Sequence, residues 1–252
     1  MPYLRPEDTL HKSYLNRLLI EIIDNILLSS SLAFKGGSCA EMLGFLDRFS
    51  VDLDFDVVTT TEASKLRGEF RKIFSHLGLT IIKASDVALF FQLKYAGKSG
   101  KRSTLRVSAS SIKIQANDYR VQYLPEVDRL ARCQTIETMF ANKLVAITDR
   151  YKLHKSIAGR DIYDTHHFFL QGYAYKKEII QERTGQEARA YLKKLIGFIK
   201  KYVTQTIVNE DLNSLLPADK FRQIRKVLIP ETLSFLTREI SEGVDTQAKN
   251  LR

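Results

Sequence analysis

Three aspartates alternate with apolar residues in the segment RFSVDLDFDV, residues 48–57. In an extended strand alternate side chains point to the same face, so Asp52, Asp54 and Asp56 share one face. Side chains two positions apart are about 6.6 Å from each other, which lets two carboxylates reach one site. Carboxylates this close favour a cation between them, and their hard oxygens suit Mg²⁺ or Mn²⁺. The segment therefore indicates a divalent-metal site or, alternatively, the solvated acidic face of an edge strand.

A Gly-Gly-Ser turn precedes these aspartates by one short segment of helical pattern. Glycine lets a backbone approach phosphate closely, and a helix N-terminus supplies free N–H groups and the positive end of the dipole. The hydroxyl of Ser38 can donate to a phosphate, or it can simply cap the helix that follows. A strand–turn–helix–strand unit can bring Gly36 and Gly37 beside the carboxylates. Together the two features indicate a site for a metal-bound nucleotide.

The hydrophobic pattern predicts the elements that must position these residues. In the N-terminal half, helices are expected over 8–28, 39–49 and 62–77. Strands are expected over 31–38, where the strand ends in the Gly-Gly turn, and over 51–58, 79–85, 88–96 and 103–110. A basic turn, GKSGKR, lies between the last two strands at 97–102.

Beyond Pro125 the pattern is helical, and no strand is expected there. Thr135 stands at the N-cap position of a predicted helix that runs to residue 153. Further helices are expected over 161–171, 175–182, 186–205, 217–227 and 231–241. We therefore predict an α+β protein with two domains: a mixed sheet flanked by helices over 1–130, and an all-helical C-terminal domain over 131–252.

The composition limits the classes of function. The chain has 39 lysine and arginine residues against 29 acidic residues, and this charge of +10 favours a polyanionic partner. Cys39 and Cys133 form no disulfide framework, which favours a reducing compartment. No stretch approaches 18 uncharged apolar residues, and the N-terminus lacks an apolar leader. We expect a cytoplasmic protein with no membrane partner.

The segments FKGGSCAEML and RFSVDLDFDV resemble the first signature of the polymerase-β-like nucleotidyltransferase superfamily. Within it they are similar to the abortive-infection toxins of the AbiEii/AbiGii type. The residues that carry this similarity are Lys35, Gly36, Gly37, Ser38, Arg48, Ser50, Asp52, Asp54 and Phe55. The resemblance implies a polymerase-β-like nucleotidyltransferase domain, followed by a helical domain that completes the active site.

Two later segments resemble motifs of the same family, so that the similarity extends over residues 10–170. The first, ETMFANKLVAITDR, contains Lys143 and Arg150. Lys143 falls on the apolar stripe of its predicted helix, where a lysine must snorkel, pair or face a polar cavity. The second, GRDIYD, contains Asp161 and Asp164 on one helix face. These two acids either belong to the site or only favour the helix N-terminus.

The resemblance implies an enzyme that transfers a nucleoside monophosphate from an NTP to an RNA acceptor, with tRNA as one candidate. In it, Asp52 and Asp54 would hold two Mg²⁺ (or Mn²⁺) ions, with Lys143 and Asp161 as further catalytic residues. The nucleotide would be bound by Lys35, Gly36, Gly37, Ser38, Arg48, Ser50, Lys143 and Asp164. The resemblance also implies the toxin of a type IV-like toxin–antitoxin pair, with a DNA-binding antitoxin encoded nearby.

One departure from the superfamily pattern leaves alternatives open. Members usually add a third carboxylate from a later strand, and here Ser108 stands at that position. Either the chemistry is slower, or Asp56, Asp161 or Asp164 replaces the missing acid, or the acid lies elsewhere in the sequence. A catalytically weak nucleotide- or RNA-binding protein with the same fold is one alternative, and nucleotidylylation of a protein target is another.

Overall fold

The structure, a computed structural model, describes residues 5–97 and 102–249. The central part of the predicted basic turn, 98–101, lies outside the described residues. The chain divides into two compact units: residues 1–113 with 118–135, and residues 114–117 with 136–252. The domain division at 130/131 stays a prediction, and the units are taken in turn below.

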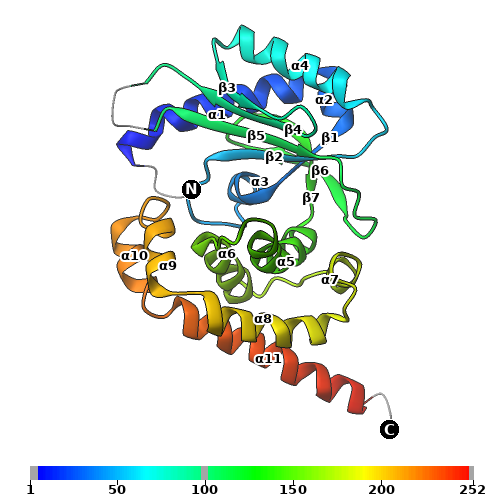
Figure 1. Cartoon of the computed structure of the whole chain (residues 1–252), viewed down its shortest axis with the longest axis vertical. Coiled ribbons are helices and arrows are strands. Elements are labelled where there is room, and N and C mark those ends of the chain that lie inside the picture. The colour runs from blue at the N-terminus through cyan, green and yellow to red at the C-terminus, as the bar shows by residue number, and fades with distance from the viewer. Residues whose placement is uncertain (1–4, 98–101, 250–252) are drawn as a thin grey trace. The chain divides into compact units, whose positions relative to one another are not determined.

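The first unit contains a seven-stranded mixed sheet with strand order β3-β4-β5-β2-β1-β7-β6 (Figure 1). The pairs β2/β5 and β1/β7 are parallel, and the other neighbours are antiparallel. This confirms the predicted fold class of a mixed sheet flanked by helices. The strands are β1 (Leu32–Lys35), β2 (Asp52–Val57), β3 (Thr80–Ala84), β4 (Leu89–Lys94), β5 (Thr104–Ser110), β6 (Tyr119–Leu124) and β7 (Arg129–Gln134).

The expectation that no strand follows Pro125 is wrong, because β7 lies beyond it and forms a hairpin with β6. The buried apolar positions of β7 are the small side chains Ala131 and Cys133, whereas Leu130 is exposed. Small buried residues between arginines give no strong strand pattern. Strand β6 is an edge strand with mostly exposed or half-exposed side chains, so its alternation is equally weak.

The sheet is covered on one face by α1 (Thr9–Asp24), α2 (Ile26–Ser31) and α4 (Ala63–His76), and α3 (Gly36–Met42) lies on the other face (Figure 1). A 3-10 turn, η1 (Pro6–Asp8), precedes α1. The predicted helix over 8–28 is interrupted at Asn25, which has an extended backbone. Its side-chain carbonyl accepts the N–H of Leu28 at 3.0 Å and caps α2.

Helix α3 differs from the predicted helix over 39–49. It begins at Gly36 and ends at Met42, so Ser38 lies inside the helix and is not its cap. The Ser38 hydroxyl instead donates to the carbonyl of Asp52, the first residue of β2, at 2.5 Å. The predicted glycine turn is thus the first turn of α3, and this bond ties it to the start of the aspartate strand.

His11, on the buried side of α1, holds the residue that precedes β2. Its Nε2–H donates to the carbonyl oxygen of Val51 at 2.9 Å, and its Nδ1 lies 3.0 Å from the hydroxyl of Tyr95. Burial lowers the pKa of His11 to about 4. The imidazole is therefore neutral near pH 7, and its hydrogen bond to Val51 connects α1 to the residue that precedes β2.

The second unit consists of helices. They are α5 (Ile136–His154), α6 (Gly159–Leu170), α7 (Lys177–Thr184), α8 (Ala188–Tyr202), α9 (Gln205–Leu212), α10 (Ala218–Ile224) and α11 (Leu228–Lys249). The predicted helix over 186–205 ends at Tyr202, because Val203 is extended and Thr204 caps a new helix, α9, through the N–H of Ile207. No helix of the described residues is long and apolar enough to cross a membrane.

Helix α9 fixes the start of α6. A Cβ added at Gly159 would lie 2.8 Å from the carbonyl oxygen of Ile207 and 2.8 Å from the Cα of Val208. The backbone N–H of Arg160 donates to Asp211 Oδ2 at 3.2 Å. The first turn of α6 therefore rests directly on the backbone of α9.

We expect Gly159→Ala to lower the free energy of unfolding by about 1–3 kcal/mol, because the added methyl group meets backbone atoms that cannot turn away. Gly197→Ala in α8 is the matched control, since a Cβ there has no neighbour within 4 Å. It should raise the free energy of unfolding by up to about 1 kcal/mol through helix propensity. Urea denaturation measures both, and equal effects of the two variants would contradict the close approach of α6 to α9.

We expect His11 to make stability depend on pH between 6.5 and 4. The unfolded chain binds a proton at this residue near pH 6.5, whereas the folded chain does so only near pH 4. The free energy of unfolding therefore decreases by about 3 kcal/mol as the pH falls through this window. Urea denaturation measures the free energy of unfolding at each pH. In His11→Gln its decrease between pH 6.5 and pH 4 should be smaller than in wild type by that amount. His76→Gln, at an exposed position, is the control, and parallel curves for wild type and His11→Gln would refute the assignment.

Candidate functional site

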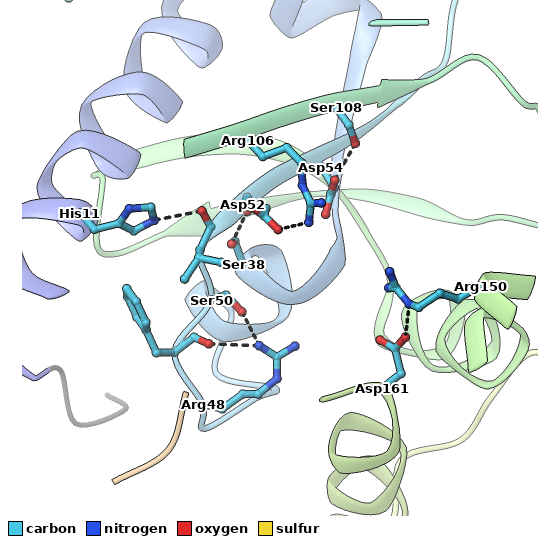
Figure 2. A network of polar contacts seen from close by, with 12 residues as sticks. His11, Ser38, Arg48, Ser50, Asp52, Asp54, Arg106, Ser108, Arg150 and Asp161 are labelled. Atoms are coloured by element: carbon cyan, nitrogen blue, oxygen red, sulfur yellow. Dashed lines mark hydrogen bonds and ion pairs between the residues drawn. The ribbon is translucent and has the colours of Figure 1, made fainter. Parts of the chain in front are cut away.

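Asp52 and Asp54 are partly exposed on one face of β2, while Leu53 and Phe55 are buried on the other. The parallel register with β5 sets Asp52 opposite Arg106 and Asp54 opposite Ser108. The guanidinium of Arg106 forms an ion pair with the carboxylate of Asp52. The hydroxyl of Ser108 donates to Asp54 Oδ1 at 2.6 Å (Figure 2). The predicted alternation is therefore present, and both carboxylates have partners on β5.

The third aspartate of the strand, Asp56, is buried and has three donors. Its carboxylate accepts bonds from Lys35 Nζ at 2.5 Å, Gln134 Nε2 at 2.7 Å and the hydroxyl of Tyr119 at 3.0 Å. These donors come from β1, β7 and β6. Asp56 thus joins three strands of the sheet, and its oxygens are already occupied by protein donors.

The glycine turn lies directly against the carboxylates. Gly36 has φ +80°, a conformation that favours glycine, and a Cβ added there would lie 3.0 Å from Asp54 Oδ2. A Cβ added at Gly37 would lie 2.8 Å from Arg48 Nη2 and 2.8 Å from Ser50 Oγ. The absence of a side chain at Gly36 lets the turn approach the carboxylate of Asp54, and its absence at Gly37 leaves room for Arg48 and Ser50.

Arg48 and Ser50 support the segment between α3 and β2. Arg48 is buried, and its Nη1 donates to Ser50 Oγ at 2.9 Å and to the carbonyl of Phe49 at 3.1 Å (Figure 2). The N–H of Ser50 donates to Glu41 Oε2 at 2.8 Å. Burial raises the pKa of Glu41, against the opposing effect of the Lys12 ammonium, which lies 2.9 Å from Oε1. The contacts of Arg48 and Ser50 therefore fix the backbone that leads into Asp52.

The predicted site residues of the second unit form a cluster of ion pairs around the buried carboxylates of Asp161 and Asp164. Lys143 Nζ of α5 lies 3.0 Å from Asp161 Oδ1 and 2.9 Å from Asp164 Oδ2, both on α6. Arg150 Nε, two turns after Lys143 on α5, lies 3.2 Å from Asp161 Oδ2 (Figure 2). Burial of Asp161 opposes its ionisation, but the charges of Lys143 and Arg150 outweigh this and lower its pKa. Lys143 therefore pairs, which is one of the three options open to a lysine on an apolar stripe.

The predicted site residues thus form two groups, one in each unit. The group of the first unit comprises Lys35, Gly36, Gly37, Ser38, Arg48, Ser50, Asp52 and Asp54, and that of the second comprises Lys143, Asp161 and Asp164. Their roles toward a nucleotide stay predictions. Two neighbours were missed as partners, Arg106 and His11. Arg106 lies two positions before Ser108 in a predicted strand, so alternation places both side chains on the same face. For His11 the sequence gives no such signal, because a single histidine on an apolar helix face does not indicate its partner.

The two partly exposed carboxylates of β2 fit a hard cation whose other ligands are substrate phosphates and water. Among residues 5–97 and 102–249, no group of three or more His, Cys, Asp or Glu side chains is arranged to hold a metal. Asp52 and Asp54 nevertheless supply two carboxylates on one face. Mg²⁺ is commonly bound by one or two carboxylates together with substrate phosphates and water. The pair therefore suits a divalent ion that arrives with a nucleotide.

Comparison with solved structures shows that the fold occurs in other proteins. JHP933 from Helicobacter pylori superimposes with a TM-score of 0.58 over 99% of this chain and 98% of that one, at 20% identity. A structure described as a "putative nucleotidyltransferase from H. pylori" gives a TM-score of 0.57 over 95% and 98%, at 19% identity. At these identities the likeness concerns the fold. No curated protein sequence matches the chain.

The family model for the nucleotidyl transferase AbiEii toxin of type IV toxin–antitoxin systems matches residues 17–245. This range includes the glycine turn, the aspartates of β2 and the ion-pair cluster of α5 and α6. It also includes most of the helical second unit. The chain therefore belongs to the AbiEii toxin family of type IV toxin–antitoxin systems and is a nucleotidyltransferase.

Proposed function

We propose that the protein transfers a nucleoside monophosphate from an NTP to an RNA acceptor, with Asp52 and Asp54 as the ligands of divalent magnesium or manganese. The observation that carries this proposal is the close approach of Gly36 to the carboxylate of Asp54. An amide-lined turn and two partly exposed carboxylates then meet at one place. This arrangement can bind the phosphates and the cation of the same metal–nucleotide complex.

The first unit would bind the triphosphate mainly through its backbone. The N–H groups at Gly36, Gly37 and Ser38 would hold the β- and γ-phosphates. The Ser38 hydroxyl donates a hydrogen bond to the backbone carbonyl of Asp52, so it positions the turn relative to β2. When bound, divalent ions would stabilise the attacking and leaving oxygens of an in-line displacement at the α-phosphorus.

The second unit would contribute charges through its ion-pair cluster. We assign Lys143 to the neutralisation of the triphosphate and Asp161 to the positioning of a metal, water or acceptor. Asp164 would act through Lys143, because its Oδ2 lies 2.9 Å from the ammonium. Membership of the family supports these assignments, since the model that matches the chain includes these residues.

Arg106 has a second role in this proposal. Its guanidinium neutralises Asp52, and a divalent ion would compete for the same carboxylate. Release from Asp52 would leave the guanidinium free to attract the triphosphate. Arg106 would thus prevent repulsion between the two aspartates until the metal and nucleotide bind.

The net charge supports RNA as the acceptor, with tRNA as one candidate. The formal charge of +10 favours a polyanion through counterion release. The same charge disfavours a cationic acceptor such as an aminoglycoside. The family implies an antitoxin partner, and we propose that this partner is a DNA-binding protein encoded next to the toxin.

We expect Asp52→Asn and Asp54→Asn each to reduce the transfer of labelled nucleotide to RNA by about 100-fold or more, because each removes a ligand charge from the metal. Incubation with each radiolabelled NTP, Mg²⁺ and total tRNA measures the transfer. Asp219→Asn, at an exposed position of α10, is the matched control and should keep wild-type activity. Wild type that labels RNA no better than Asp52→Asn would refute the proposal, and label on a polypeptide would replace RNA by a protein acceptor.

We expect Arg106→Gln to bind Mn²⁺ about tenfold more tightly than wild type in the absence of nucleotide, because a competing cation is removed from Asp52. The same variant should bind an NTP more weakly. Electron paramagnetic resonance of free Mn²⁺ measures the first effect without any turnover. Arg120→Gln on the edge strand β6 is the control for loss of one positive charge. Equal Mn²⁺ affinity of wild type and Arg106→Gln would contradict competition between Arg106 and the metal.

A further inference from the structure

Three aromatic rings gather where the end of α5 meets the end of α8. The ring of Tyr151 lies 5.3 Å from that of Phe198 and 4.6 Å from that of Tyr202, measured between centroids. Phe198 and Tyr202 are 4.9 Å apart. All three side chains are only half-buried, unlike Phe140 and Phe168 in the core of the same unit. The cluster therefore presents part of its aromatic surface to solvent.

Two lysines lie over the same rings. Lys155 Nζ is 5.3 Å from the centroid of Tyr151, and Lys201 Nζ is 5.0 Å from that of Tyr202. Side-chain hydrogen bonds from Lys201 and from Tyr151 lower the pKa of the Tyr202 hydroxyl. Lys155 has φ 52°, a left-handed conformation that is uncommon for a residue other than glycine. Its N–H bonds to the carbonyl of Tyr151 and ends α5, which holds the lysine beside the ring.

The surroundings of the rings are positively charged. Helix α8 has no acidic residue, and its basic residues are Arg189, Lys193, Lys194, Lys200 and Lys201. The apolar side of α8 is buried, and all four of its lysines are exposed. The end of α5 adds the exposed segment 152–156, which contains Lys152, His154 and Lys155. Half-exposed rings thus lie within a surface rich in lysine.

This combination matches the chemistry of unpaired nucleotides. Every base has a flat face that can stack on an aromatic ring, and each nucleotide carries a phosphate that lysine can neutralise. A lysine over the face of a ring is attracted to the ring and can also neutralise a nearby phosphate. An apolar protein segment would gain contact with the rings but would also have to cover the exposed lysine side chains around them.

We propose that Tyr151, Phe198, Tyr202, Lys155 and Lys201 form a docking surface for unpaired nucleotides of the RNA acceptor. This inference rests on the proposed function, because it names the part of the chain that holds the acceptor. The surface lies on α5 and α8, and it includes none of the residues assigned above to the metal or the triphosphate. Loss of docking and loss of chemistry can therefore be measured separately.

Fluorescence anisotropy of a labelled 12-nucleotide single-stranded RNA with the full chain tests the stacking part. Tyr202→Leu and Phe198→Leu should each weaken binding about tenfold, because a base loses its aromatic partner while apolar packing is kept. Tyr202→Trp keeps an aromatic face and should bind at least as well as wild type. Circular dichroism melts verify that each variant is folded, and wild-type affinity in both leucine variants would overturn the proposal.

The salt dependence of the same measurement tests the charges. Lys155→Gln with Lys201→Gln should reduce the slope of log K against log salt by about 1.4, since each phosphate contact on a single strand contributes about 0.7. Lys65→Gln with Lys72→Gln on α4 removes the same charge elsewhere and should leave the slope close to wild type. An equal loss of slope in both double variants would contradict a local phosphate contact.

Two further measurements separate this inference from its alternatives. A duplex RNA of the same length should be insensitive to Tyr202→Leu, and equal weakening of duplex and single strand would overturn the assignment to unpaired bases. Binding of anionic phosphatidylserine vesicles in place of RNA would assign the surface to a membrane and overturn it as well. Asp52→Asn should keep RNA affinity while it loses nucleotide transfer. In wild type, ring-dependent RNA binding without any nucleotide transfer would refute the proposed function but support the docking surface.

Discussion

The arrangement of the first unit depends on the place of β2 between β1 and β5. The antiparallel neighbour β1 leads into the glycine turn and brings Gly36 against Asp54. The parallel neighbour β5 sets Arg106 and Ser108 opposite the two exposed carboxylates. One strand therefore receives the amide groups from one side and the polar side chains from the other. The contacts of Asp52 and Asp54 with Arg106, Ser108 and Gly36 follow from these two registers.

Several aspartates of the candidate site are paired with cations of the chain itself. Asp52 pairs with Arg106, Asp56 with Lys35, and Asp161 with Lys143. Unpaired carboxylates at such short spacing would raise one another's pKa and weaken the fold. These ion pairs therefore relieve that repulsion within the chain itself. Asp52 is partly exposed and Asp56 is buried, so under the proposed function a metal could displace Arg106 from Asp52 but not Lys35 from Asp56.

The sequence predicted the parts of the fold that have strong patterns, and it failed where patterns are weak. The alternation in β2 and the apolar stripes of α1 and α4 correspond to the observed elements, and the family and mixed sheet are confirmed. Strand β7 was missed because its buried residues are small. The start of α3 was placed too late, because the hydroxyl of Ser38 bonds to a distant strand and not to its own helix. Alternation in β5 places Arg106 on the face of Ser108, but the register that sets it opposite Asp52 is not visible in a single sequence.

Helix α9 contains none of the motif residues, yet its backbone supports the first turn of α6, on which Asp161 lies. Its sequence, QTIVNEDL, would attract no attention in a search for catalytic groups. A genetic selection for inactive alleles should nevertheless recover substitutions here, since a shift of this short helix moves an acid that it never touches. Sensitivity to mutation in this protein therefore extends to segments whose only contribution is the position of their main chain.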